Sequence, residues 1–192
     1  MTRRSTILKF AVSALVAAAA HGQGAEIIVS VADQELALLD RGKAIARYPI
    51  STSKFGLGDG VGTYRTPLGT MYVSGKVGDS LAAGAVIKSR TATGEVIAPN
   101  APGRDPIVSR VLWLRGKEGQ NRNARERCIY IHGTAEEKRI GRRASYGCIR
   151  MKSKDVIALY TRVHIGTPVT ITGKQLAQFL PAEEETLLAR SY

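Results

Sequence analysis

Short apolar segments bounded by glycine, proline and other turn residues follow one another along most of this chain of 192 residues. Segments rich in β-branched and aromatic residues favour strands, and glycine or proline between them marks turns. On this pattern we expect strands at 26–31, 35–39, 44–51, 71–73, 108–114, 129–132 and 169–172. The pattern therefore predicts a mainly β fold, either a sandwich or a barrel-like sheet.

Helices are expected only toward the C-terminal end. Ser153 can cap a helix, and Asp155 is favourably placed in its first turn. Apolar residues that can face the sheet follow at Val156, Ile157, Leu159 and Tyr160. Residues 173–192 are expected to form a helical tail, with the acidic run 183–185 as a solvated face. One or two helices should thus pack against the sheet.

The first 24 residues have the pattern of a signal peptide. Arg3, Arg4 and Lys9 precede an apolar stretch at 10–20, and small residues follow it. This stretch is shorter than the ~20 apolar residues of a membrane-spanning helix, although a retained membrane anchor is the alternative. We expect cleavage between Ala20 and Gly24, export to the periplasm or cell wall, and one folded domain at 25–172.

The chain has a formal net charge of +12, of which Arg3, Arg4 and Lys9 of the expected signal peptide supply three units. A strong positive charge favours anionic surroundings. Nucleic acid is not the expected partner, because the basic residues are scattered, aromatic residues make up 6% of the chain and no nucleic-acid motif is present. Carboxylate-bearing wall peptides or anionic lipids fit an exported protein better. Residues that flank the candidate site could hold such carboxylates or form a solvated loop: Arg122, Arg125, Arg127, Lys138, Arg139, Arg142 and Arg143.

Residues 129–134 and 144–151 carry most of the functional information. The first segment is an apolar run that ends at His132 and Gly133, as a strand does when it delivers a polar side chain to its end. The second contains a tight turn with the pattern Ser-x-Gly-Cys at 145–148. The polar residues between them are numerous enough for the chain to loop back, so Cys148 can approach His132.

This pair predicts nucleophilic catalysis by a thiol. A free cysteine is only a few per cent thiolate at neutral pH, so a neighbouring base such as His132 must take its proton. Gly147 lets the backbone approach a substrate carbonyl, and the amides of Gly147 and Cys148 could then stabilise an oxyanion, with Gly133 as a further backbone candidate. The arrangement is typical of acyl-enzyme chemistry.

Two other interpretations of these residues remain open. A single cysteine is often an inert buried residue, and a single histidine is often a satisfied core or surface group. Cys128, His132, Cys148 and His164 are also possible metal ligands, but their spacing matches no familiar zinc pattern.

The segments at 132–134, 140–141 and 145–151 resemble the signature of the L,D-transpeptidase (YkuD-type) catalytic domain. Residues 48–52, 66–73 and 166–171 resemble the remaining landmarks of that domain in the same order, so the resemblance spans roughly 25–172. It implies the L,D-transpeptidase fold, and it implies neither a metal nor an organic cofactor.

The resemblance also implies roles for individual residues. Cys148 resembles the acylated nucleophile, and His132 resembles the general base that a backbone carbonyl polarises. Gly147 and Cys148 resemble the donors of the oxyanion amides. Three residues resemble positions that shape the substrate-binding site: Ser145, Tyr146 and Arg150. Tyr146 departs from the motif, which usually has a second histidine here, and a tyrosine cannot act as a base near neutral pH.

The resemblance implies a peptidoglycan L,D-transpeptidase. Cys148 would attack the amide before the terminal D-alanine of a tetrapeptide stem and pass the acyl group to an amine on a second stem or on a wall-attached protein. Hydrolysis of the same bond, as in a carboxypeptidase, and a non-catalytic wall-binding module are the alternatives. The expected form is a monomer.

Both cysteines are expected to be free. If Cys128 and His132 share one strand, their α-carbons lie ~13 Å apart at ~3.3 Å per residue. A disulfide between Cys128 and Cys148 would then draw the nucleophile away from its base.

Overall fold

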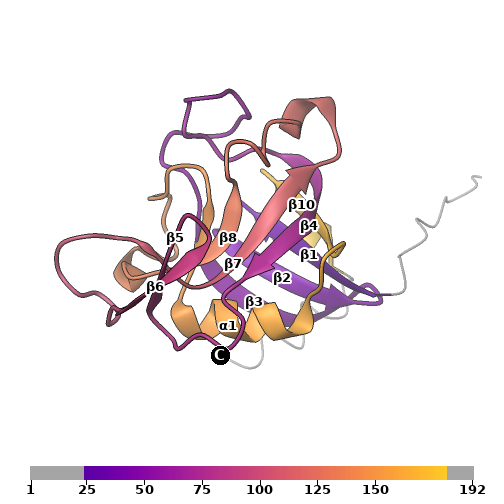
Figure 1. Cartoon of the computed structure of the whole chain (residues 1–192). Helices are drawn as coiled ribbons and strands as arrows, with labels where there is room; N and C mark the ends of the chain where they lie inside the picture. The colour runs from indigo at the N-terminus through magenta and orange to yellow at the C-terminus, as the bar shows by residue number, and fades with distance from the viewer. Residues whose placement is uncertain (1–23, 181–192) are drawn as a thin grey trace, which may run out of the picture.

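The computed structural model describes residues 24–180, and within them ten strands form one mixed sheet that closes into a ring (Figure 1). The expectations for 1–23 and 181–192 lie outside these residues. In chain order the strands are β1 (Ala25–Ser30), β2 (Glu35–Asp40), β3 (Lys43–Ser51), β4 (Gly69–Val77), β5 (Ala85–Lys88), β6 (Thr91–Val96), β7 (Ile107–Gly116), β8 (Tyr130–Thr134), β9 (Ile149–Met151) and β10 (Pro168–Thr172).

The strand order in the sheet is β4-β10-β1-β2-β3-β9-β8-β7-β5-β6, and β4 also pairs with β7. Because of that extra pairing, eight strands close on themselves while the β5–β6 hairpin extends from β7. Two neighbouring pairs are parallel, β1 with β10 and β8 with β9. The expected mainly β, barrel-like sheet is confirmed.

Apolar side chains fill the inside of the ring, as expected for a barrel of this strand number. The main core cluster includes Ile27 and Val29 from β1, Leu112 from β7, and Ile149 from β9, all 0–1% exposed. Alternate residues of these strands face the core, which explains why the apolar segments could be recognised as strands in the sequence.

The single α-helix found between residues 24 and 180, α1 (Ser153–Arg162), packs against β7 and β8. Its Val156 and Leu159 are fully buried in the main core cluster, as the helical spacing predicted. The prediction that Ser153 caps the helix with its side chain was wrong: the cap residue is Lys152, and no side-chain cap bond is present. The Glu137 carboxylate instead accepts the Ser153 N–H at 2.8 Å, which satisfies one of the free donors of the first turn.

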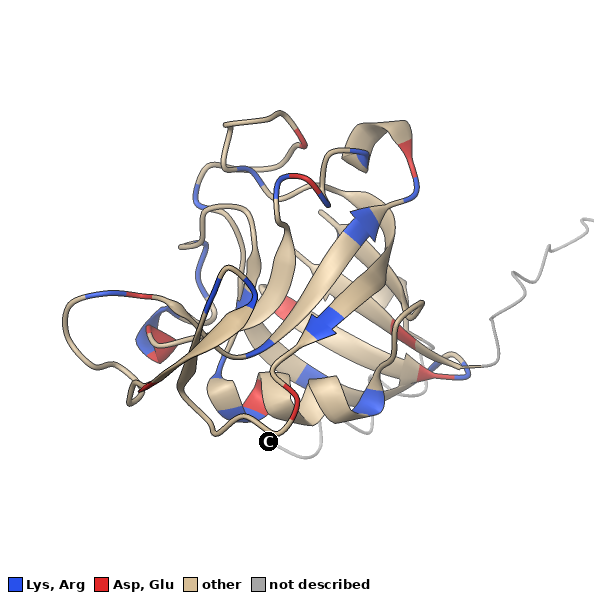
Figure 2. Ribbon diagram, viewed as in Figure 1, with Lys and Arg blue, Asp and Glu red and all other residues tan. Residues whose placement is uncertain are grey.

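Three short 3₁₀ turns complete the described structure: η1 (Gly119–Asn121), η2 (Glu137–Arg139) and η3 (Leu176–Gln178). The described part of the C-terminal segment, 173–180, contains η3, and its Leu176 and Leu180 are buried against Ile28 and Leu39 of the sheet. No helix within 24–180 is long and apolar enough to cross a membrane. Lys and Arg are spread over strands and loops in the view of Figure 2, in agreement with the scattered pattern in the sequence.

Candidate active site

The site lies where the parallel strands β8 and β9 run side by side. Ile131 pairs with Ile149 and His132 with Arg150, so the residue before β9, Cys148, comes beside the start of β8. The Tyr130 N–H donates a hydrogen bond to the Cys148 Sγ at 3.4 Å. This parallel pairing is the feature that brings the two sequence segments together.

The turn that presents Cys148 depends on Gly147. Its φ of +121° is in a region that favours glycine, and a β-carbon there would lie 3.3 Å from the Arg65 carbonyl oxygen. The hydroxyl of Thr66 donates to the Gly147 carbonyl at 3.0 Å, while the Gly147 N–H donates to the Ser145 hydroxyl at 3.2 Å. The Gly147 amide is therefore engaged within the turn and would have to be released before it could bind an oxyanion.

Ser145 is fully buried within this turn. Its hydroxyl donates to the Cys148 carbonyl at 2.6 Å and accepts the Gly147 N–H. These contacts fit a residue that positions the nucleophile, whereas contact with a substrate would require it to be accessible.

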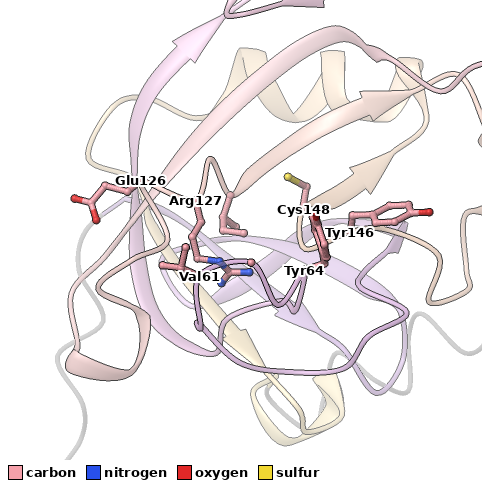
Figure 3. A pocket seen from close by; sticks show the side chains of 8 residues that line it. Val61, Tyr64, Glu126, Arg127, Tyr146 and Cys148 are labelled. Atoms are coloured by element: carbon pink, nitrogen blue, oxygen red, sulfur yellow. The ribbon is translucent and has the colours of Figure 1, made fainter.

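The Cys148 thiol lines a pocket of about 220 Å³. Figure 3 shows Tyr64 and Tyr146 beside it and Glu126 at the other end of the pocket. The complete lining consists of Val61, Gly62, Tyr64, Glu126, Arg127, Ile129, Tyr146 and Cys148. Burial raises the pKa of the Cys148 thiol to about 11, although the Tyr130 N–H opposes this shift. The free protein thus holds a protonated thiol at neutral pH.

His132 is buried, and its Nδ1 lies 2.8 Å from the Gly133 carbonyl oxygen. A carbonyl can only accept, so Nδ1 carries the proton and Nε2 keeps a free lone pair. Burial lowers the pKa of the His132 imidazole to about 4, and the bond to Gly133 opposes the shift. No hydrogen bond joins this ring to the Cys148 thiol, whose bonds within 24–180 are to Tyr130 and to the Cys128 carbonyl.

Gly133 allows β8 to approach β7 very closely. A β-carbon on Gly133 would lie 2.5 Å from the Val108 carbonyl oxygen and 3.2 Å from the Val156 side chain. A larger residue would displace β8 and with it His132.

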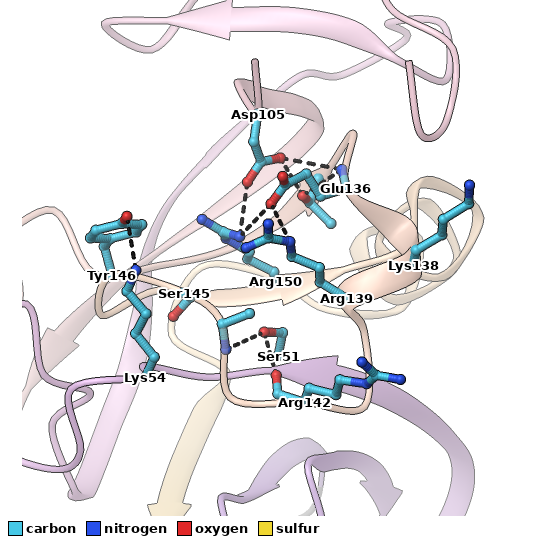
Figure 4. A network of polar contacts seen from close by, with 12 residues as sticks. Ser51, Lys54, Asp105, Glu136, Lys138, Arg139, Arg142, Ser145, Tyr146 and Arg150 are labelled. Carbon is cyan, nitrogen blue, oxygen red and sulfur yellow. Dashed lines mark hydrogen bonds and ion pairs between the residues drawn. The ribbon is translucent and has the colours of Figure 1, made fainter. Parts of the chain in front are cut away.

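Arg150 lies among carboxylates on the side of the site that Figure 4 shows. Its guanidinium is 2.9 Å from a carboxylate oxygen of Asp105 and 3.5 Å from one of Glu136. The Thr134 hydroxyl donates to the same Asp105, so the end of β8 is tied to the start of β7 and to β9. Arg150 is buried and paired, and it is better placed to fix the strands than to bind a substrate.

The loop between β3 and β4, residues 52–68, forms the opposite wall of the pocket. A buried ion pair between its Asp59 and Arg127 holds it in place. Arg127 lies 2.8 Å from Asp59, with side chains only 7% and 6% exposed. The same guanidinium donates to the Arg65 carbonyl at 2.7 Å, and the Asn123 N–H donates to Asp59 at 2.7 Å. These contacts hold the loop over the nucleophile.

The assumption that Cys128 shares a strand with His132 was wrong. Strand β8 begins at Tyr130, and Cys128 is in the left-handed region with a φ of +56°, so the chain turns there. The Cys148 thiol donates to the Cys128 carbonyl at 3.3 Å. Both cysteines are free, as expected. The separation of ~13 Å expected between the α-carbons of Cys128 and His132 does not apply, because the two residues do not share a strand.

Tyr146 is exposed at the rim of the pocket, where it contacts two other aromatic rings. Its centroid lies 5.5 Å from that of Phe55 and 5.9 Å from that of Tyr64. The Lys54 ammonium donates to its hydroxyl at 3.1 Å and lowers the pKa of the Tyr146 phenol.

Several residues of this region carried no local signal in the sequence. Lys54, Asp59 and Asp105 lie in irregular segments, and their partners are 29 to 92 positions away in the chain. Of the basic residues expected to flank the site, Arg127 and Arg139 are paired with Asp59 and Glu136, and Arg125 donates to the Ser74 hydroxyl at 2.6 Å. Within the described chain no three His, Cys, Asp or Glu side chains come together as a metal site would require.

Comparison with known proteins agrees with the sequence pattern. The family model of the L,D-transpeptidase catalytic domain (YkuD) matches residues 24–171. The Bacillus subtilis (strain 168) protein YkuD is 38% identical over 81 residues, which are 42% of this chain and 49% of that protein. YqjB of the same organism is 45% identical over 42 residues, which are 22% of this chain and 24% of that protein. The chain thus spans about half or less of the length of these curated relatives.

Solved structures with a similar fold include an L,D-transpeptidase from Xylanimonas cellulosilytica, with a TM-score of 0.52 and 17% identity over 78% of this chain and 61% of that one. L,D-transpeptidase 3 from Mycobacterium tuberculosis, in complex with a faropenem-derived adduct, has a TM-score of 0.51 and 18% identity over 78% of this chain and 60% of that one. At these identities the similarity concerns the fold.

Proposed function

The chain belongs to the L,D-transpeptidase (YkuD) family, and from this premise we propose that it is an exported enzyme that forms a thioester on Cys148 from a peptidoglycan tetrapeptide stem. The acyl group then passes to an amine on a second stem or on a wall-attached protein. The observation that carries this proposal is the Cys148 thiol at the wall of a pocket of about 220 Å³, directly before strand β9, which pairs with the strand of His132.

In the first step the Sγ attacks the carbonyl carbon of the amide before the terminal D-residue. The thiol proton goes to Nε2 of His132, and the carbonyl electron pair moves onto oxygen. Since the thiol pKa is about 11 and the imidazole pKa about 4, the proton is transferred together with the attack and not before it. The tetrahedral intermediate then expels the D-residue, whose amine nitrogen takes the proton from His132.

In the second step an acceptor amine attacks the thioester. It gives a proton to the neutral His132, and the departing sulfur of Cys148 takes a proton back, so the enzyme returns to its first state. Water in place of the amine would give hydrolysis of the same bond. Backbone amides near Cys148 are the proposed oxyanion donors, and Tyr130 joins Gly147 and Cys148 as a candidate because its N–H already points at the sulfur.

The proposed arrangement of the chain is a signal peptide at 1–24, a catalytic domain at 25–172 and a C-terminal tail at 173–192. N-terminal sequencing of protein recovered from the periplasm should find a start between His21 and Ala25. A mature protein that begins at Met1 or Thr2 would favour an anchored form instead.

The catalytic proposal is tested with purified disaccharide-tetrapeptide and intact-protein mass spectrometry. We expect an adduct on Cys148 equal to the stem less its terminal D-alanine, and no adduct on the Cys148→Ala variant. A cross-linked product indicates transfer to an amine, whereas a tripeptide product alone indicates hydrolysis. Absence of any adduct or product, with a folded protein, would favour the wall-binding module.

A further inference from the structure

Four side chains beside the pocket form an exposed rim: Lys54, Phe55, Tyr64 and Tyr146. The three rings lie within 5.5–5.9 Å of one another and are 44%, 56% and 54% exposed in the order Phe55, Tyr64, Tyr146. Large exposed aromatic clusters are uncommon on soluble proteins and mark binding surfaces. Tyr64 and Tyr146 also line the pocket of Cys148, so the rim continues the surface that a bound peptide would contact.

The rim also carries a cation that is held in place. The Lys54 ammonium lies 4.5 Å from the Tyr146 ring centroid and 5.1 Å from that of Phe55, and it donates to the Tyr146 hydroxyl. The Lys54 N–H donates to the Ser145 carbonyl at 3.1 Å, which ties this residue to the turn of the nucleophile. Such contacts restrict a side chain that is otherwise flexible.

Within residues 24–180 Lys54 forms no salt bridge with a carboxylate, whereas two other cations around the thiol already have partners. Arg127 pairs with Asp59, and Arg150 pairs with Asp105 and Glu136. A fixed ammonium without a carboxylate, bordered by apolar rings, is complementary to a carboxylate attached to an aliphatic group.

We propose that the rim of Lys54, Phe55, Tyr64 and Tyr146 is a specificity subsite that binds a carboxylate of the peptide substrate through Lys54 and the adjoining aliphatic part through the rings. This inference rests on the proposed function. The carboxylate is either that of the terminal D-residue or an internal one on the stem, and the test separates these two sources.

The test uses three synthetic stem tetrapeptides: the free acid, the C-terminal carboxamide, and a peptide amidated at the internal carboxylate of the diamino acid. Binding to the Cys148→Ala protein gives Kd by calorimetry, and turnover by the active protein gives kcat and KM. Lys54→Met removes the charge but keeps most of the aliphatic stem, and Lys54→Arg restores a cation. The matched control is Lys43→Met, because Lys43 is exposed at the opposite end of β3 from the site.

We expect Lys54→Met to weaken binding of the free acid roughly three- to tenfold, mainly through KM, as for a partly exposed ion pair. Lys54→Met should leave binding of one of the two amidated peptides unchanged. The carboxylate that this peptide lacks is the one that Lys54 binds. Lys54→Arg should recover most of the loss, and Lys43→Met should change nothing. Phe55→Ala should weaken binding of all three peptides, because it removes apolar contact while Tyr146 still holds the Lys54 ammonium.

An equal effect of Lys54→Met on all three peptides, or none on any, would refute the subsite. If the peptides bind with the expected pattern but are not turned over, the subsite stands and the proposed function fails. If they are turned over without that pattern, the function stands and the subsite fails.

Discussion

Burial of His132 should make the stability of this protein depend on pH between about 4 and 6.5. The imidazole has a pKa of about 4 in the fold, against ~6.5 for an unperturbed histidine. Between these values the unfolded chain binds a proton that the folded chain does not, so the free energy of unfolding falls as the pH is lowered. The contribution is complete above pH 6.5, and the loss reaches about 2 kcal/mol at pH 5 and about 3 kcal/mol at pH 4.

Carboxylates titrate in the same range, so the measurement compares the protein with a His132→Gln variant that has no imidazole. Urea unfolding at pH 8, 7, 6, 5 and 4 gives the difference in the free energy of unfolding between the two proteins. That difference should be constant from pH 8 to 7, where the histidine is neutral in both states, and should shrink by about 3 kcal/mol between pH 7 and 4.

A difference that stays constant down to pH 4 would refute the reasoning, because His132 would then take up its proton equally well in both states. The same protonation should limit activity. The acid limb of kcat/KM is expected near pH 4, well below that of an exposed histidine.

Four further outcomes are expected. Cys148→Ala should abolish acyl transfer, whereas Cys128→Ala should lower the free energy of unfolding by at most about 1 kcal/mol. Thiol counting in denaturant without reductant should find two free cysteines. The rate of Cys148 alkylation by iodoacetamide, followed by mass, should rise about tenfold per pH unit from 7 to 10, because the thiol pKa is about 11; a plateau near pH 8 would contradict this. Gly147→Ala should lower the free energy of unfolding by ~1–2 kcal/mol in a urea titration, because φ at this position is +121°. It should also slow acylation of Cys148. A fully active variant of unchanged stability would contradict the turn described. Tyr146→His should keep Cys148 acylation within about tenfold, since one hydrogen bond is worth ~1 kcal/mol; loss of acylation would make Tyr146 essential to the first step.

The strands of the ring could largely be predicted from the sequence, because their apolar residues alternate into a shared core. The strands β5, β6 and β9 could not. All six residues of β6 are exposed, and β9 has only three residues, so neither contains a long apolar run. The pairing of β9 with β3 and β8, and of β5 with β7, also depends on segments that are distant in the chain, which a local pattern does not encode.

The candidate site shows the same division. The turn at 145–148 has a local pattern, because Gly147 allows the positive φ that the turn requires. The strand end at His132 also has one, because β-branched and aromatic residues precede it. The Asp59–Arg127 pair and the Asp105–Arg150 pair join segments more than 40 positions apart, and nothing near Asp59 or Asp105 distinguishes them from ordinary loop residues. The error at Cys128 had a local cause: a residue with a φ of +56° ended the extended run before the strand.

The closed ring also has a consequence for cooperativity. Strands β8 and β9 each have a paired neighbour on both sides, so Cys148 and His132 cannot be separated by fraying of a sheet edge. Opening between them must break a continuous cycle of pairings, and it should therefore cost nearly as much as global unfolding. The β5–β6 hairpin joins the ring only through β7, so it should open at lower cost than the ring and without separating Cys148 from His132.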